Sequence, residues 1–314
     1  TVKGAVEAVN SSDEIRGILV GKQDMIAKEL EKYEYAKEDI EVVHASEIID
    51  MGDVPTVAIK DKKDSSLVVA MRLVREGKAD ALVSAGSTGA VLVGGQLVVG
   101  RLKGIKRPPL APFIPTTKGF SLLIDCGANV DARPEHLVQF AQMGSIYYEN
   151  VMGKKNPTVA LLNIGTEEEK GNQLVKDTKP LMKECKNINY IGSVEARELV
   201  SGAADVIVCE AFVGNVVLKF FEGLALTLFG SLKEGLMSST RTKLGALLVK
   251  PALKGLKNQF DTSSQGGAPL LGLKGLVVKA HGNSSSKEIE IALKQCISFK
   301  KQKINEKIKE SICD

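Results

Sequence analysis

The chain has 314 residues, of which 44% are hydrophobic and 25% are charged, and its formal net charge is +4. This is the composition of an ordinary soluble globular protein, with room for one large domain or two small ones. The weak positive charge and the 4% aromatic content argue against nucleic acid as a partner. No stretch approaches the roughly 20 uninterrupted apolar residues of a membrane span, and no secretory signal is recognisable.

Apolar runs alternate with segments of helical periodicity along the chain. The predicted strands occupy 18–20, 41–43, 81–83, 120–124, 158–162, 190–191, 206–209 and 276–278. The predicted helices occupy 23–32, 65–76, 134–148, 168–186, 195–199, 216–229 and a C-terminal segment from 286. This alternation predicts a three-layer α/β/α fold with a mostly parallel central sheet. The proline-rich segment 107–115 interrupts it, and we expect that segment to be extended, at a sheet edge or between layers.

Cations and apolar side chains are interleaved over residues 230–260. The cations are Lys233, Arg241, Lys243, Lys250, Lys254 and Lys257, against one acid, Glu234. The pattern predicts a pair of basic amphipathic helices broken near Pro251. The pair could pack on the core or on a second copy of the chain. Alternatively it binds anionic lipid or an acidic protein, and the contact residues are then Lys243, Leu247, Leu248, Lys250 and Lys254.

The cysteines are dispersed, without a Cys-x-x-Cys pair. They are Cys126, Cys185, Cys209, Cys296 and Cys313. An odd, scattered count predicts reduced thiols in a cytosolic protein. Cys126 and Cys209 stand at strand ends, where one could be a nucleophile, although such cysteines are more often small buried apolar residues. No grouping of His, Cys, Asp and Glu has metal-ligand spacing, and neither a metal nor another cofactor is expected.

Five predicted strands end in turns built from glycine and small polar residues. The turns are 84–89, 125–129, 163–167, 210–215 and 280–284. Because α/β sheets bind ligands outside the carboxyl ends of their strands, these turns together predict one anion-binding rim.

The first of these turns offers hydroxyls and unencumbered amides where a helix begins. Its residues are Ser84, Gly86, Ser87, Thr88 and Gly89. Helix N-termini suit phosphate because they carry unsatisfied N–H groups and partial positive charge. Such turns also use Ser and Gly merely to turn and cap, and this one is neither a Walker A loop nor a Gly-x-Gly-x-x-Gly fingerprint.

Polar side chains recur in the next two turns. Asp125 and Asn129 could bind a ligand, although Asp125 could equally cap the turn. Asn163 is followed by Glu167, with Lys170 one helical turn further on the same face. That spacing suits either a ligand site or a surface ion pair.

The last two turns carry a lysine and a histidine. Glu210 and Asn215 precede Lys219, whose neighbours Val216 to Phe221 are otherwise apolar. These neighbours argue against solvent exposure of Lys219 and favour an anion as its target. His281 is the histidine placed at a strand end, where a structural hydrogen bond and a catalytic role are both open.

These residues together resemble the PlsX family of bacterial acyl-ACP:phosphate acyltransferases. The matching blocks are 84–89, 100–108, 125–131, 134–144, 162–172, 191–197, 212–223, 266–272 and 281–282. They span essentially the whole chain in the family's order. Ser87 stands where the family often has Asn, and Glu210-Ala211 where it usually has Asp-Gly. The family opens with a strand and an Asp-Ala-Met-Gly-Gly-Asp-like loop that has no match here, so we expect that edge of the rim to be missing.

The resemblance implies an activity and a fold. Inorganic phosphate attacks the thioester of an acylated acyl carrier protein (ACP), giving acyl phosphate for phospholipid synthesis. The implied fold is isopropylmalate-dehydrogenase-like, here as a single catalytic domain over 1–314 with 230–260 as a helical projection. The resemblance also implies a homodimer in the cytoplasm, peripherally associated with the inner face of the cell membrane.

The residues in the matching blocks then receive expected roles. The expected catalytic residues are Lys170, Lys219, Asn215 and His281. The expected substrate-binding residues are Ser84, Gly86, Ser87, Thr88, Gly89, Asp125, Asn129, Asn163, Glu167 and Glu210.

Three rival functions stay open at this point. A phosphotransacetylase-like enzyme would perform the same chemistry on acyl-CoA. A nicotinamide-dependent decarboxylating dehydrogenase would share the fold class, but it needs a metal-binding carboxylate cluster, and Asp125, Asp131 and Glu210 are too separated in sequence to argue for one. A non-catalytic lipid- or ACP-binding scaffold would act through 230–260.

Overall fold

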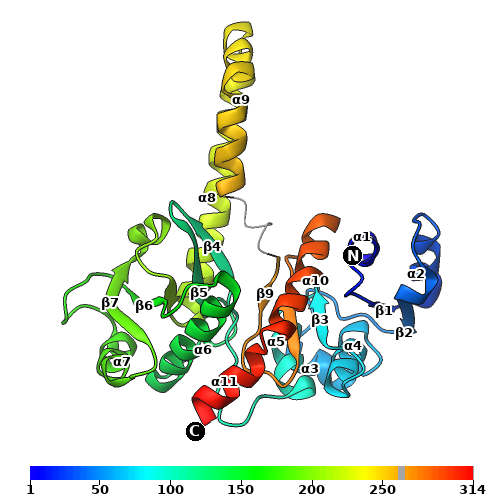
Figure 1. The fold of residues 1–314 in the computed structure, drawn as a ribbon, viewed down its shortest axis with the longest axis horizontal. Coiled ribbons are helices and arrows are strands. Elements are labelled where there is room, and N and C mark those ends of the chain that lie inside the picture. Colours follow the sequence, from blue (N-terminus) through cyan, green and yellow to red (C-terminus); the bar gives the residue numbers. More distant parts are fainter. Residues whose placement is uncertain (261–265, 314) are drawn as a thin grey trace.

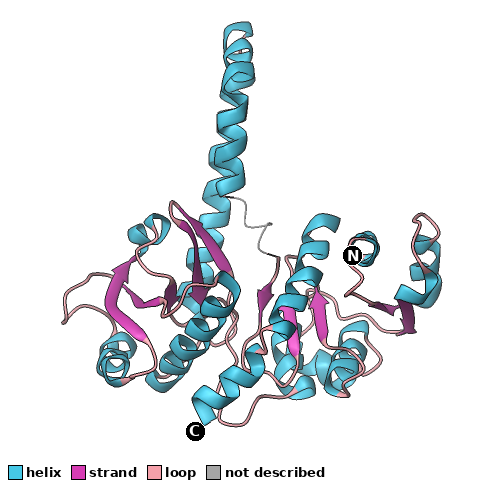
Figure 2. Cartoon of the chain, viewed as in Figure 1, coloured by secondary structure: helices cyan, strands magenta, loops and turns pink. Residues whose placement is uncertain are grey.

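The computed structural model describes residues 1–260 and 266–313. Two groups of strands are flanked by helices, and a helical hairpin projects away from them (Figures 1 and 2). The strands are β1 (Gly17–Gly21), β2 (Ile40–His44), β3 (Ala81–Ser84), β4 (Phe113–Thr116), β5 (Gly119–Ile124), β6 (Thr158–Asn163), β7 (Asn189–Glu195), β8 (Val206–Val208), β9 (Ala268–Pro269) and β10 (Leu276–Lys279).

Helices connect most of these strands. The α-helices are α1 (Val2–Asn10), α2 (Gln23–Leu30), α3 (Pro55–Asp61), α4 (Ser66–Arg75), α5 (Thr88–Gly94), α6 (Pro134–Met152), α7 (Gln173–Glu184), α8 (Ala211–Met237), α9 (Thr240–Gln259), α10 (Ser286–Lys301) and α11 (Ile304–Cys313). Shorter helical turns are η1 (Lys37–Asp39), η2 (Gly95–Val99) and η3 (Ala196–Ser201).

The strands form a mixed α/β fold that is mostly parallel, as the sequence predicts. One sheet has the order β4-β5-β8-β6-β7, a second has the order β3-β10-β9, and β1 pairs with β2. The pairs β4–β5 and β9–β10 are antiparallel, and the other pairs are parallel. The proline-rich segment 107–115 leads into β4 at the edge of its sheet, which confirms the expectation for it.

Backbone hydrogen bonds connect the two larger sheets. Ala111 N donates to Pro269 O at 3.1 Å, and Leu271 N donates to Pro109 O at 3.0 Å. The segment that carries these bonds also donates from Leu123 N to Pro112 O, at 3.0 Å. The strand ends of both sheets are therefore held in fixed positions relative to one another.

The core forms where buried strands meet α6. The inner residues of β5, such as Leu122 and Ile124, are fully buried, and so are Phe140 and Tyr147 on α6. Pro134 occupies the first turn of α6, where its missing N–H costs no hydrogen bond. Buried apolar runs therefore position β5, β6, β8 and β10, whose polar ends contribute to the rim, whereas β3 is half-buried.

The predicted helix pair is present, but its break lies elsewhere. The sequence places the break near Pro251, whereas α9 continues through that residue and the chain turns at Ser238–Ser239. Ser239 starts α9 because its Oγ accepts a hydrogen bond from Thr242 N at 3.2 Å. A proline can be accommodated in an exposed helix by bending, so the serine cap rather than the proline sets the boundary.

The hairpin formed by α8 and α9 leaves the body of the protein (Figure 1). The end of α9 returns to α8, where the rings of Phe221 and Phe260 lie 6.5 Å apart. Leu226 is 77% exposed and Leu248 84% exposed. Beyond the first turns of α8 the hairpin projects away from the core, so residues 230–260 do not form the core-packed helix pair that the sequence left open. By length and composition α8 could also cross a bilayer, an expectation that the sequence did not raise.

The helix after β6 starts later than predicted. The sequence suggests a start at 168, but α7 begins at Gln173 because Asn172 Oδ1 accepts a hydrogen bond from Val175 N at 2.9 Å. Gly171 precedes this cap with φ +114°, a conformation that glycine adopts without strain. The residues between β6 and Asn172 therefore form a loop rather than a first helical turn.

The first turn of α8 approaches the end of β5 so closely that only glycine fits. A Cβ at Gly214 would lie 1.9 Å from the carbonyl oxygen of Asp125. We expect Gly214→Ala to lower the free energy of unfolding by about 1–3 kcal/mol, because overpacking forces the backbone apart. Urea unfolding followed by circular dichroism measures the change.

The matched control is Gly223→Ala in the same helix. A Cβ at Gly223 meets nothing within 4 Å, so helix propensity should stabilise this variant by up to about 1 kcal/mol. Equal effects of the two substitutions would show that the close approach at Gly214 does not constrain the fold.

Candidate active site

The ends of β3 and β10 bring the first and last polar turns together. Ala280 N donates to Ser84 O at 2.9 Å, which extends the parallel pairing past the strands. A Cβ at Gly282 would lie 3.9 Å from Ala85 O. The turn 84–89 and His281 therefore occupy one part of the rim.

Within the turn 84–89, the polar residues divide into supporting and accessible groups. Ser87 is buried and caps α5, because its Oγ accepts from Ala90 N at 3.4 Å. Ser84 Oγ accepts from Gly86 N at 3.2 Å. Gly86 and Thr88 are exposed. Ser87 therefore shapes the turn, while its neighbours face the solution.

Asp125 is the organising residue of the second turn rather than an exposed ligand. Its carboxylate is fully buried and accepts hydrogen bonds from Leu110 N at 2.9 Å and Ala128 N at 3.2 Å. It also accepts from Asn129, through N at 2.8 Å and Nδ2 at 2.8 Å. Burial raises the pKa of Asp125 to about 6, against the opposing effect of these donors. The sequence left two roles open for Asp125, binding a ligand or capping its turn, and this geometry is that of a cap.

Asn129 is committed to the same network. Its Nδ2 donates to Pro108 O at 3.0 Å as well as to Asp125, and its Oδ1 is buried without a partner among the described residues. Its backbone oxygen accepts from Ala211 N at 3.1 Å. Both amide protons are used internally, so Asn129 is placed to hold the rim together rather than to bind an oxyanion.

The start of α8 adds Glu210 and Asn215 to this part of the rim. Glu210 caps α8, since its carboxylate accepts from Phe212 N at 2.6 Å and Val213 N at 2.9 Å. Asn215 is exposed one turn later, and a Cβ at Gly127 would lie 3.9 Å from its Oδ1. The turns 125–129 and 210–215 therefore meet, with Asn215 as the accessible side chain.

The loop after β6 is held from beneath by two buried side chains. Asn163 Nδ2 donates to Gly165 O at 2.8 Å and to Lys170 O at 3.1 Å. Lys179 on α7 is 3% exposed, and its Nζ donates to the carbonyls of Glu167 at 3.0 Å, Glu168 at 2.8 Å and Lys170 at 3.0 Å.

The side chains of Glu167 and Lys170 both pass over Gly165, where an added Cβ would lie 2.5 Å from Glu167 Oε2 and 3.1 Å from Lys170 Cγ. Both residues are exposed. The ion pair between them that the spacing allowed is not among the ion pairs of the described residues. Lys170 is therefore available to an incoming anion.

Lys219 is more exposed than its sequence neighbours predict. Its side chain is 52% exposed and pairs with Glu222 at 2.8 Å. The prediction of a shielded lysine is wrong because α8 leaves the body of the protein, so that Val216 and Phe220 are themselves exposed. An anion at Lys219 would have to compete with Glu222.

Lys279 is a rim residue that the sequence reasoning missed. It ends β10 opposite Ser84 in the parallel register, is 9% exposed, and donates from Nζ to Ala280 O. Burial lowers the pKa of Lys279, and the positive charge of Lys219 lowers it further. The signal in the sequence was a lysine closing the apolar run of β10.

The described cysteine side chains are free thiols. They belong to Cys126, Cys185, Cys209 and Cys296. Burial raises the pKa of Cys126 and Cys209 well above the ordinary range, so neither presents a thiolate nucleophile to the rim. Among the described residues, no group of three His, Cys, Asp or Glu side chains could hold a metal ion.

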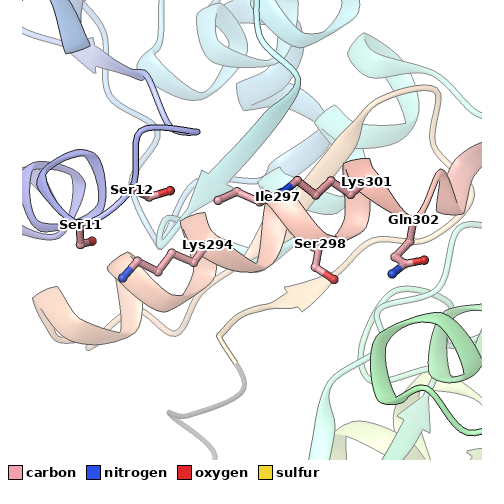
Figure 3. A pocket seen from close by; sticks show the side chains of 7 residues that line it. All are labelled: Ser11, Ser12, Lys294, Ile297, Ser298, Lys301 and Gln302. Carbon is pink, nitrogen blue, oxygen red and sulfur yellow. The ribbon is translucent and has the colours of Figure 1, made fainter.

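A cavity of about 500 Å³ lies away from the rim, between the end of α1 and α10 (Figure 3). Ser11 and Ser12 line one side, and Lys294 and Lys301 lie on the helix opposite. Lys294 already pairs with Glu290 at 2.7 Å, and Lys301 pairs with Glu14 at 2.6 Å. The cations of this cavity are thus neutralised internally, unlike Lys279 at the rim.

Solved structures share the fold of this chain. A phosphotransacetylase from Streptococcus pyogenes superposes with a TM-score of 0.65, at 17% identity, covering 95% of this chain and 91% of that one. A protein described as a 4-hydroxythreonine-4-phosphate dehydrogenase from Salmonella typhimurium reaches a TM-score of 0.50, at 13% identity, covering 95% and 94%. At these identities the likeness concerns the fold alone, and it agrees with the predicted dehydrogenase-like fold class.

Sequence comparison gives a closer relationship. The phosphate acyltransferase of Alkaliphilus oremlandii is 54% identical over 312 residues, which cover 99% of this chain and 92% of the relative. The model of the family described as "Fatty acid synthesis protein" matches residues 1–307. The chain therefore belongs to this fatty acid synthesis protein family.

Proposed function

We propose that this protein transfers a fatty acyl group from acyl-ACP to inorganic phosphate, releasing acyl phosphate and free ACP for phospholipid synthesis. The observation that carries the proposal is the meeting of the polar strand ends at one rim, where Lys279 is buried without a carboxylate partner among the described residues. The name phosphate acyltransferase of a relative 54% identical supports the same reaction.

The chemistry requires positioning and charge stabilisation. A phosphate oxygen attacks the thioester carbonyl carbon and gives a tetrahedral oxyanion; the C–S bond then breaks, the carbonyl re-forms, and the thiolate takes a proton from solution. Phosphate is already an anion at neutral pH, and a thiol of pKa about 8.5 is a good leaving group. Neither a cysteine nucleophile nor a strong acid is needed, in keeping with the buried thiols of Cys126 and Cys209. The rate then depends on donors aimed at the developing oxyanion.

His281 and Asn215 are the accessible donors for that oxyanion. His281 Nδ1 accepts from Asn283 N at 3.2 Å, which leaves the proton of a neutral imidazole on Nε2. Both His281 and Asn215 are exposed. We assign them to the thioester carbonyl, and we assign Lys170 to the phosphate or to the anionic intermediate.

The two parts of the hairpin suit different partners. From Phe220 to Leu232 its exposed side chains are largely apolar and uninterrupted by lysine, as expected where a second copy of the chain packs. On α9, Leu247 and Leu248 stand beside Lys243, Lys250 and Lys254. A basic amphipathic surface of this kind binds anionic bilayers. We therefore propose a cytoplasmic homodimer that touches the inner face of the membrane with the basic surface of α9.

The proposed reaction predicts phosphate-dependent thiol release from acyl-ACP. Incubation with acyl-ACP and phosphate should yield acyl phosphate and free thiol in equal amounts, and omission of phosphate should abolish both. A parallel incubation with acyl-CoA distinguishes a phosphotransacetylase-like activity. Thiol release that ignores phosphate, or no release from either donor, would overturn the proposal; the latter would favour a non-catalytic scaffold.

Lys170→Ala should reduce the phosphate-dependent turnover number by about 10- to 100-fold, because a charge-assisted contact to the anion is lost. Steady-state rates over a range of phosphate concentrations measure the effect. Lys176→Ala is the matched control, since Lys176 is exposed on the adjacent helix α7. Normal turnover in the Lys170 variant would remove this lysine from the scheme.

Replacing Leu247 and Leu248 with Glu should abolish sedimentation with vesicles of anionic phospholipid, because two apolar contacts become charges of the wrong sign. Turnover of acyl-ACP in solution should be retained, since both residues lie on the exposed part of α9 that projects away from the body of the protein (Figure 1). The control is Met25→Glu with Ile191→Glu, which alters exposed apolar residues outside the hairpin. Unchanged vesicle binding would leave a second copy as the partner of this surface.

A further inference from the structure

We propose that Lys279 is the main anchor of inorganic phosphate at the rim, at a site that Ser84 and Lys219 complete. The identity of the anion rests on the proposed function. The existence of an anion site rests on the surroundings of Lys279 alone.

Lys279 is a buried cation placed where three strands meet. It is the last residue of β10, which lies between β3 and β9, and its register partners are Ser84 and Ala268. The residue is 9% exposed, and its ammonium group is partly desolvated. Such desolvation is costly unless the charge finds hydrogen-bond acceptors or a counter-ion.

A second buried lysine in the same molecule, Lys179, has all the hydrogen-bond donors of its ammonium group satisfied. An ammonium group has three N–H donors, and Lys179 places its Nζ on three backbone carbonyls. In the described chain Lys279 has one such acceptor, Ala280 O. All three donors of Lys179 are therefore used within the protein, whereas Lys279 retains two donors for a ligand.

The charge balance around Lys279 also favours an anion. The ion pairs of the described residues include none with Lys279. The charged group that acts on it is Lys219, which lowers its pKa after the larger effect of burial. Two like charges near one another are destabilising. A phosphate ion between them would turn this repulsion into attraction, although Glu222 offsets part of the charge of Lys219.

Ser84 supplies the neutral donor of the site. It stands opposite Lys279 on the neighbouring strand, and its Oγ already accepts from Gly86 N. A hydroxyl group that accepts one hydrogen bond keeps its own proton for donation. Phosphate, which offers only acceptor oxygens when fully ionised, matches a site composed of N–H and O–H donors.

The test compares Lys279→Met with Lys279→Gln and the exposed control Lys274→Met. Calorimetric titration with inorganic phosphate should show about 10- to 100-fold weaker binding in both Lys279 variants, the loss of one charged hydrogen-bonding partner. The KM for phosphate should rise by a similar factor, with the KM for the acyl donor unchanged. Lys274→Met should match the wild type.

Thermal unfolding separates an anchor from a merely structural lysine. Without phosphate, Lys279→Met should melt at or above the wild-type temperature, because a buried charge has been removed. The increase in melting temperature that phosphate causes in the wild type should disappear. A variant that melts lower without phosphate, yet keeps the full phosphate-induced increase, would overturn the assignment.

Two further outcomes are decisive. A higher KM for the acyl donor with unchanged phosphate binding would overturn the assignment, because Lys279 would then contact a phosphate carried by the donor. Phosphate binding that depends on Lys279 in a protein without acyl transfer would refute the proposed function and leave the phosphate anchor in place.

Discussion

The rim depends on one buried carboxylate. Asp125 accepts N–H groups from the segment before β4 and from its own turn, and Asn129 passes the connection on to the start of α8. The segment it holds also carries the hydrogen bonds between the two larger sheets. Bonds to an ionised group are worth more than neutral ones, about 1.5–3 kcal/mol each. Loss of this carboxylate would therefore loosen both the sheet junction and the rim.

Three lysines on and beneath the rim differ in the partners of their ammonium groups. The ammonium group of Lys179 donates to three backbone carbonyls, that of Lys219 to a carboxylate, and that of Lys279, among the described residues, to one backbone carbonyl. Lys179 fixes the loop after β6. Lys219 carries a charge that can exchange its carboxylate for another partner, and Lys279 favours the binding of an anion. Residue type alone does not distinguish these roles, since all three are lysines, one on α7, one on α8 and one at the end of β10.

The sequence predicts the strands and their polar ends because buried parallel strands are continuous apolar runs. It also identifies Asp125 as a possible cap, but not its partner Leu110, which depends on how distant segments meet. The exposure of Lys219 was mispredicted for a similar reason, because helical periodicity does not show that α8 leaves the core. The projection itself was predictable, since its interleaved cations resist burial. Lys279 needed the register of β10 against β3 before its isolation could be seen.

The length of α8 sets the distance between the rim, where the proposed reaction takes place, and a partner bound at the far end of the hairpin. The helix begins at Ala211, next to its cap Glu210 on the rim, and runs for 27 residues, which corresponds to about 40 Å at 1.5 Å per residue. A protein held by the far end of its hairpin would keep the rim in the aqueous phase, at a stand-off greater than the thickness of a headgroup layer. An acylated product leaving the rim would then cross a short layer of water that the hairpin itself spans with apolar side chains.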